Sequence, residues 1–142
     1  MSTYRSVSQQ DFQEAELVLK HRIYRTAVYL FQQFAEKGAK SLLEKKDPTH
    51  KSMRSHRVED ILAAYDEAHK ISGLSDMARY LTSFYFNTRY PGDNYSDVTE
   101  AQAQKAHQSA LELKKYFDAE LDRLDQMNAD ENIDIDGLKK LV

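Results

Sequence analysis

The chain has 142 residues, of which 41% are hydrophobic and 30% are charged, with four Gly, two Pro and no Cys. This length fits one domain, and the apolar content and the scarcity of Gly and Pro favour an all-α domain over a disordered chain or a β-sandwich. The absence of Cys excludes disulfides, thiolate metal sites and a thiol nucleophile.

Charge is distributed unevenly along the chain. Residues 1–57 carry 11 Lys/Arg against 6 Asp/Glu, a net charge of +5, whereas residues 58–142 carry 9 against 17, a net charge of −8. This division could steer an anionic ligand towards the first half, or bring the basic face of one protomer against the acidic face of another. Solvated helix faces are the simpler interpretation.

Neither a secretory signal nor a membrane span is predicted. The N-terminal segment MSTYRSVSQQDFQ lacks a basic region followed by an apolar run, and the chain contains no run of about 18 apolar residues. We therefore expect a cytoplasmic protein that does not interact with a membrane.

Apolar spacing predicts two helices before residue 48. Residues 8–20 begin with Ser8 and Asp11, a short variant of the capping box, and continue with apolar residues on one helical face. Residues 23–45 show the same periodicity more strongly, at Tyr24, Ala27, Val28, Phe31, Phe34, Ala35, Gly38 and Leu42. Pro48 ends this second helix because it lacks the backbone donor that a helix requires.

Two shorter helices are predicted after this break. The apolar stripe of the third helix consists of Val58, Ile61, Leu62 and Tyr65. The fourth helix starts near Ser75, and its stripe consists of Met77, Ala78, Leu81, Phe84 and Tyr85. The dipeptide Pro91-Gly92 ends this fourth helix.

The last helix is predicted to be the longest. Thr99 and Gln102 form a capping box, and an apolar stripe follows for about seven turns, at Ala103, Ala106, Ala110, Leu113, Phe117, Leu121 and Leu124. We expect residues 1–125 to form the helical domain and residues 126–142 to form a C-terminal tail. The five amphipathic segments predict an all-α, up-and-down bundle of about five helices.

The sequence predicts no metal site and no cofactor. The segment NIDIDG at 132–137 matches the start of a calcium loop, but the chain ends before the bidentate Glu that such a loop requires. No two of the five His residues have a spacing that binds zinc. His107 lies beside the stripe of the last helix, which favours a partly buried structural role, and His56 precedes the third helix, where it either shapes the turn or reaches a cleft.

Polar residues lie beside the apolar stripe of the second helix: Gln32, Gln33, Glu36, Lys37 and Lys40. Glu36 and Lys40 are one turn apart. Their simplest interpretation is an exposed ion pair that contributes roughly 0.3 kcal/mol.

Four segments, in this order, resemble the HEPN domain, a small helical domain named from higher eukaryotes and prokaryotes and associated with nucleotide binding. They are YRTAVYLFQQFAEKGAKSLL at 24–43, SHRVEDIL at 55–62, LTSFYFNTRYPGD at 81–93 and TEAQ at 99–102. The resemblance covers roughly residues 8–125. It implies a bundle of about five helices that commonly dimerises and is often encoded or fused beside a small nucleotidyltransferase.

Many members of this family are RNases or toxins of toxin–antitoxin pairs, and their signature is an Arg followed a few residues later by a His. Arg89 matches the Arg, but Asn94, Tyr95 and Ser96 occupy the positions where the His is expected. Asn and Ser cannot exchange a proton near neutral pH, and Tyr titrates near ~10, so no catalytic residue is predicted. The RYP form resembles a branch of the family that lacks the RNase signature and binds a ligand or a partner.

The resemblance implies a binding cleft formed by Gln33, Glu36, Lys37, Lys40, Arg89, Tyr90 and Asp93. Glu36 and Lys37 match the AEK of the family, and Arg89 is expected to face them. The guanidinium of Arg89 can hold either Glu36 or a phosphate. The expected ligand is a nucleotide, RNA or a partner protein such as a nucleotidyltransferase, and the expected assembly is a homodimer.

Two alternatives to this non-catalytic binding domain stay open. The protein could be an RNase toxin in which Arg89 acts with a distant histidine such as His56. It could also be an interaction module in which Tyr90 and Tyr95 anchor a partner enzyme.

Overall fold

The computed structural model describes residues 2–66, 73–89 and 97–140, and the side chains of 86–89 and 131–140 lie outside this description. Within these ranges the chain forms five α-helices and one short 3₁₀ helix: α1 (Tyr4–Lys20), α2 (Tyr24–Lys46), η1 (Lys51–Arg54), α3 (Val58–Tyr65), α4 (Ser75–Arg89) and α5 (Glu100–Lys140). The predicted all-α fold of about five helices is confirmed. No helix in the described ranges is long and apolar enough to cross a membrane.

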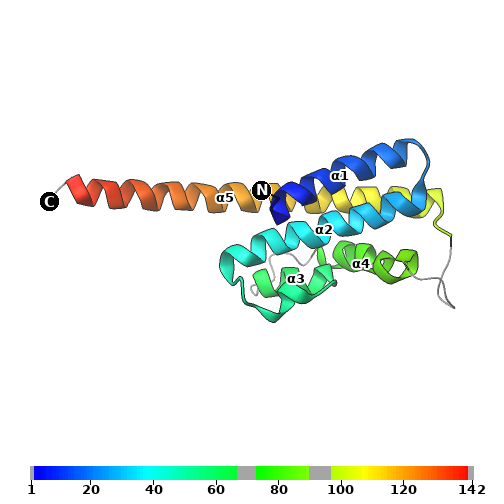
Figure 1. Cartoon of the computed structure of the whole chain (residues 1–142), viewed down its shortest axis with the longest axis horizontal. Coiled ribbons are helices and arrows are strands. Elements are labelled where there is room, and N and C mark those ends of the chain that lie inside the picture. Colours follow the sequence, from blue (N-terminus) through cyan, green and yellow to red (C-terminus); the bar gives the residue numbers. More distant parts are fainter. Residues whose placement is uncertain (1, 67–72, 90–96, 141–142) are drawn as a thin grey trace.

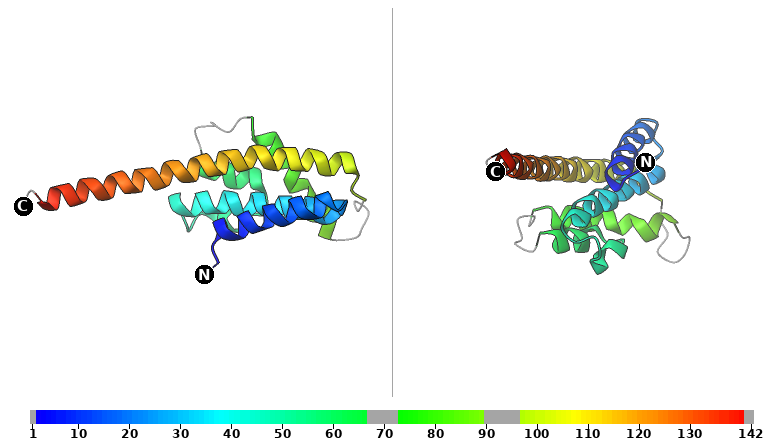
Figure 2. Two further views of the ribbon diagram at one scale, coloured as in Figure 1. Left: turned by 90° about the horizontal axis from the view of Figure 1, so that it is seen from above. Right: turned by 60° about the vertical axis from the view of Figure 1, so that its left-hand side comes forward.

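Helix α2 is the centre of the bundle. It packs against α1 on one side and against α3 and α4 on the other, while α5 runs along α2 and α4 (Figure 1 and Figure 2). The apolar side chains of α2 fill the core, and most of them are fully buried: Ala27, Val28, Phe31, Ala35, Ala39, Leu42 and Leu43. Because α2 touches every other α-helix, a polar residue on α2 can be buried wherever a neighbouring helix covers it.

Helix α1 begins at Tyr4 instead of the predicted Ser8. Its N-cap is Thr3, whose Oγ1 accepts a hydrogen bond from the Ser6 N–H at 3.0 Å, while the Ser6 Oγ accepts one from the Thr3 N–H at 2.9 Å. This reciprocal pair is hard to recognise in the sequence because Glu or Gln is the usual residue at the third position. Ser8 is buried, and its hydroxyl donates to the Phe34 carbonyl at 2.8 Å.

The turn between α1 and α2 is a Schellman motif with Arg22 in the left-handed conformation, at a φ of 62°. The Arg22 N–H donates to the Leu19 carbonyl and the Ile23 N–H donates to the Val18 carbonyl, both at 2.9 Å. Gly is the usual residue at this position, since a side chain costs about 1 kcal/mol there. The turn reverses the chain, so that α2 returns antiparallel to α1 (Figure 1).

Helix α5 begins with the predicted capping box. The Gln102 Oε1 accepts from the Thr99 N–H at 2.9 Å, and the Thr99 Oγ1 accepts from the Gln102 N–H at 3.1 Å. The predicted apolar stripe is buried from Ala103 to Leu121. Beyond it the helix leaves the bundle: residues 125–130 are exposed, and α5 continues as far as Lys140 (Figure 1).

Candidate functional site

A buried carboxylate on α2, that of Glu36, is the centre of a polar cluster. Its Oε2 accepts a hydrogen bond from the Lys40 Nζ at 3.1 Å, and its Oε1 accepts one from the Gln32 Nε2 at 3.2 Å. Gln32 is fully buried, and Glu36 and Lys40 are each 6% exposed. The prediction that Glu36 and Lys40 form an exposed ion pair is therefore wrong. The helices around α2 cover the face that carries this pair as well as the apolar stripe.

Gln33 extends the cluster towards the surface. Its Nε2 donates to the Gln32 Oε1 at 2.6 Å, and its side chain is half-buried. Of the predicted site residues, the structure thus brings Gln33, Glu36 and Lys40 into one hydrogen-bonded network.

His56, from the connection between η1 and α3, joins this network. Its Nδ1 lies 3.1 Å from the Glu36 Oε1, and its ring stacks on that of Tyr85 in α4, with centroids 4.4 Å apart and planes inclined by 12°. The His56 side chain is 49% exposed, whereas Tyr85 is buried. Glu36 therefore holds one nitrogen of an imidazole that remains accessible from the surface.

This arrangement has two chemical consequences. The positive charge of Lys40 compensates the buried carboxylate of Glu36, which would be very unfavourable alone. The Glu36–His56 contact also fixes the orientation of the imidazole, because a carboxylate at Nδ1 favours the tautomer with its proton on that nitrogen. The site thus combines a fixed, half-exposed imidazole with a charge-compensated carboxylate behind it.

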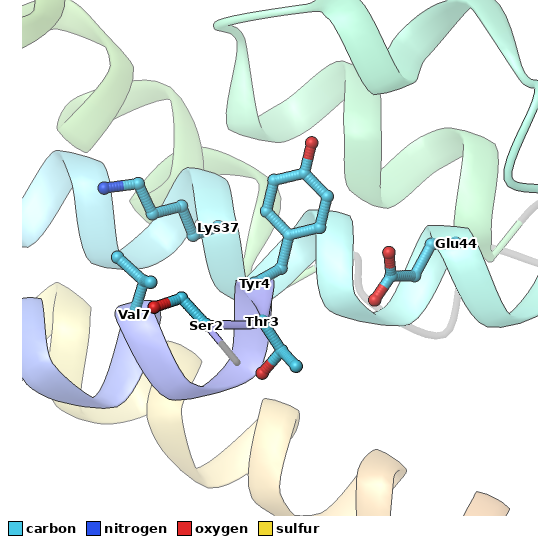
Figure 3. Close-up of a pocket in the computed structure, with 6 residues that line it drawn as sticks. All are labelled: Ser2, Thr3, Tyr4, Val7, Lys37 and Glu44. Atoms are coloured by element: carbon cyan, nitrogen blue, oxygen red, sulfur yellow. The ribbon is translucent and has the colours of Figure 1, made fainter.

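Lys37 belongs to a different surface of α2. Its Nζ contacts the Asp11 Oδ2 of α1 at 2.7 Å. It also lines a pocket of about 430 Å³ beside the start of α1, together with Ser2, Thr3, Tyr4, Val7 and Glu44. Figure 3 shows the ring of Tyr4 standing between the side chains of Lys37 and Glu44.

Arg89 is the last residue of α4, one turn beyond Tyr85. The side chain of Arg89 and the whole of Tyr90, Asp93 and Tyr95 lie outside the described residues. One helical turn corresponds to a rise of about 6 Å for four residues. The stacking of Tyr85 on His56 therefore brings the last turn of α4 close to the Glu36 cluster.

The predicted cleft left out Gln32 and Tyr85, although Gln32 was among the polar residues noted beside the apolar stripe of the second helix. Gln32 lies one turn before Glu36, and Tyr85 lies one turn before Arg89, so the four-residue spacing was the available signal. Tyr85 was assigned to the apolar stripe, which is correct for its burial but leaves out its contact with His56.

His107 has the partly buried structural position that the sequence predicts. Its Nε2 lies 2.9 Å from the Glu16 Oε2, and its ring stacks on Phe31 with centroids 5.2 Å apart. Among the described side chains, those of residues 2–66, 73–85 and 97–130, no three His, Asp or Glu are grouped closely enough to hold a metal ion.

Comparisons with known proteins decide the family. The family model of the HEPN domain matches residues 1–120. The chain belongs to the HEPN family. This HEPN match extends over α1 to α4 and the first half of α5, and it includes Glu36, His56 and Arg89.

Two solved structures have the HEPN fold seen here. TT1696 from Thermus thermophilus has a TM-score of 0.72 and 23% identity, over 82% of this chain and 94% of that chain. ST0689, an archaeal HEPN homologue, has a TM-score of 0.67 and 23% identity, over 84% and 98%. No curated protein sequence matches the chain. At these identities the likeness shows the HEPN fold alone.

Proposed function

We propose that this HEPN protein is a non-catalytic binding domain for a phosphate-bearing ligand, a nucleotide or RNA, which binds at Arg89 and His56. The observation that carries the proposal is that the Glu36 carboxylate is already hydrogen-bonded and charge-compensated. Both of its oxygens already have partners, and Lys40 compensates its charge. Arg89 is not needed to neutralise Glu36, so its guanidinium is assigned to the ligand.

The chemistry of Arg89 and of the residues that follow it fits such a ligand. A guanidinium binds phosphate through two parallel hydrogen bonds, and its position at a helix C-terminus is favoured by the helix dipole. Tyr90 directly follows Arg89 and Asp93 is four residues after it. Both are assigned to the same site, where an aromatic ring can stack on a base. The absence of a His at Asn94, Tyr95 and Ser96 supports a binding role over a catalytic one.

Titration calorimetry with a panel of nucleotides and short RNAs tests this proposal. Arg89→Gln should weaken binding by roughly 10- to 100-fold, since a hydrogen bond to a charged group contributes about 1.5–3 kcal/mol. Arg79→Gln is the matched control, because Arg79 is also on α4 but is exposed and pairs with Asp76 at 3.4 Å. Absence of heat with every nucleotide and RNA would contradict the proposal and leave a protein partner as the ligand.

The Glu36–His56 contact favours a second candidate, a metal-independent RNase. A carboxylate that holds Nδ1 leaves Nε2 to act as a general base, and Arg89 would then stabilise the charge on the phosphate. Incubation of the purified protein with labelled RNA distinguishes the two functions. Cleavage that is lost in His56→Gln would support the RNase, and intact RNA after prolonged incubation would end this alternative.

The assembly we propose is a homodimer, with a nucleotidyltransferase as a candidate partner. The net charges of +5 and −8 in the two parts of the chain make a contact between unlike faces of two copies favourable. Light scattering should give twice the mass of 16.5 kDa, and a monomer mass at all concentrations would contradict the dimer. A nucleotidyltransferase encoded beside this chain would support the partner.

A further inference from the structure

We infer that Lys51, Arg54 and Arg57 form a docking surface for the backbone of single-stranded RNA, which leads into the site at His56. We call these three residues the η1 cation surface. The inference rests on the proposed function, since it selects RNA from the phosphate-bearing ligands of that site. It adds a place where several phosphates bind at once.

The η1 cation surface is a group of unpaired charges. All three side chains are exposed, and within the described part of the chain none of their charged groups has an acidic partner. Residues 48–58 contain these three cations and no Asp or Glu. By contrast, Lys37 and Lys40 of α2 are both held in ion pairs. The three charges therefore remain available to an external anion.

Two of these cations are placed where they repel each other. A 3₁₀ helix has about three residues per turn, so Lys51 and Arg54 lie on the same edge of η1 and repel each other. Arg57 holds the N-cap position of α3 without a side-chain capping bond. A cation there meets the positive end of the helix dipole, which Glu59 and Asp60 in the first turn of α3 partly offset. A chain of phosphates would offset the repulsion between Lys51 and Arg54.

The segment that carries these cations is fixed in place. The Ser52 N–H donates to the His50 Nδ1 and the Arg57 N–H donates to the Ser55 Oγ, both at 3.0 Å. The next residue, Val58, donates its N–H to the Thr82 Oγ1 of α4 at 2.9 Å. The backbone of this segment therefore loses little conformational entropy when a ligand binds.

Position relative to the proposed site favours RNA over a mononucleotide. His56 lies between Arg54 and Arg57 in the chain, and its half-exposed ring is supported by Tyr85. Cations interleaved with an aromatic ring suit a single strand, whose phosphates meet the charges while a base stacks on the ring. A nucleoside monophosphate bound at Arg89 has no further phosphate for these three cations.

The test measures binding of a labelled single-stranded oligouridylate between about 50 mM and 1 M salt. The variant is the triple replacement Lys51→Gln, Arg54→Gln and Arg57→Gln. The matched control replaces three exposed lysines on α1 and α5, Lys20, Lys105 and Lys115, with Gln. Both variants change the net charge equally, and circular dichroism checks that both are folded.

Each phosphate contact contributes about 0.7 to the slope of log affinity against log salt for a single strand, so the triple variant should lose about 2 from the slope. This corresponds to roughly 100-fold weaker binding near 0.1 M salt, with the difference closing towards 1 M. The control should retain the slope of the unmodified protein.

Other results overturn the inference. An equal loss of RNA affinity in both variants would show that only the net charge of the protein matters. Unchanged affinity in the triple variant would show that RNA does not use the η1 cation surface. In both cases RNA binding that still depends on Arg89 leaves the proposed function intact. Equal affinity for oligoglutamate, lost in the same variant, would reassign the surface to an acidic protein. If the unmodified protein binds neither RNA nor nucleotides, the proposed function fails as well.

Discussion

At the scale of single residues, the Glu36–Lys40 pair shows how burial changes the meaning of a common helical spacing. On an exposed helix such a pair contributes little, but here both side chains are almost completely withdrawn from water. Breaking a buried pair leaves an uncompensated charge, which is much more costly than losing a surface contact.

We predict that Glu36→Gln lowers the free energy of unfolding by about 3–5 kcal/mol, because the charge of Lys40 then remains buried without a counter-charge. Urea denaturation measures the change. Glu44→Gln is the control, at a half-buried position on the same helix that lines the pocket beside α1. A loss below about 1 kcal/mol for Glu36→Gln would show that Lys40 reaches water by another path.

Tyr65 makes stability depend on alkaline pH. Its burial, together with a hydrogen bond of 2.8 Å to Glu120 and the charge of that carboxylate, raises the pKa of Tyr65 from 10.0 to about 12. The neutral hydroxyl is therefore favoured in the folded state. Its contribution is complete below pH about 10 and is lost as the pH rises through about 12.

The stability difference between the unmodified protein and Tyr65→Phe should accordingly shrink between pH about 10 and about 12. Chemical denaturation at several pH values measures it. Tyr4→Phe, at an exposed tyrosine, is the control for the loss of a tyrosine hydroxyl. A difference for Tyr65→Phe that does not change with pH would contradict the assigned cause.

Part of the candidate site follows from sequence spacing alone. Gln32, Glu36 and Lys40 share a face because they are separated by four residues, and this is visible in the chain. Their burial is not visible, since it depends on how the neighbouring helices pack over α2. The approach of His56 to Glu36 joins residues that are 20 positions apart, and it depends on the path of η1.

At the scale of helices, the contact between α2 and α5 depends on Gly38, which has no side chain. A Cβ at Gly38 would overlap the ring of Phe117, which is 3% exposed and fixed in the core. Ala103, Ala106 and Ala110 at the start of α5 are also fully buried, and such small side chains allow a neighbouring helix to come close. The large ring of Phe117 on α5 fits because Gly38 of α2 leaves space for it.

We predict that Gly38→Ala lowers the free energy of unfolding by about 1–3 kcal/mol, because Phe117 must move within a packed core. Thermal and urea unfolding both report the loss. Gly73→Ala is the control, since no atom lies within 4 Å of a Cβ placed there. A stabilising effect of Gly38→Ala, as expected for an unhindered helical position, would show that the ring moves easily.

The helices themselves were largely predictable, because their apolar periodicity and the Thr99–Gln102 capping box are local signals. The start of α1 was not, since its capping box uses Ser6 where a longer side chain is usual. Ser8 has the right residue type for a cap, but its hydroxyl is used by the carbonyl of Phe34.

At the scale of the whole molecule, α5 is much longer than the bundle that it completes. Leu121 is the last buried residue of its stripe, and Asp125 still reaches the body, 3.5 Å from Arg5 and 3.9 Å from Lys45. All of residues 126–130 are exposed. This supports the proposed division between a domain of residues 1–125 and a C-terminal tail of residues 126–142.

Truncation after Asp125 should therefore leave the melting temperature of the bundle unchanged while the helical signal in circular dichroism decreases. The removed residues are expected to contribute helix but little burial. Truncation after Leu113 is the contrasting variant, because it removes Phe117 and Leu121 from the core and should prevent folding. A large fall in the melting temperature after the first truncation would show that the tail packs on the bundle.

The extension of α5 also determines what can be attached to the protein. A helix rises about 1.5 Å per residue, so residues 125–140 carry the end of the helix roughly 24 Å beyond the body. Figure 1 shows this end on the side opposite the end of α4, where Arg89 lies. A fluorophore or surface linker coupled at the C-terminus would thus be held away from the proposed binding site at Arg89 and His56. That site then stays open to RNA in an immobilised sample.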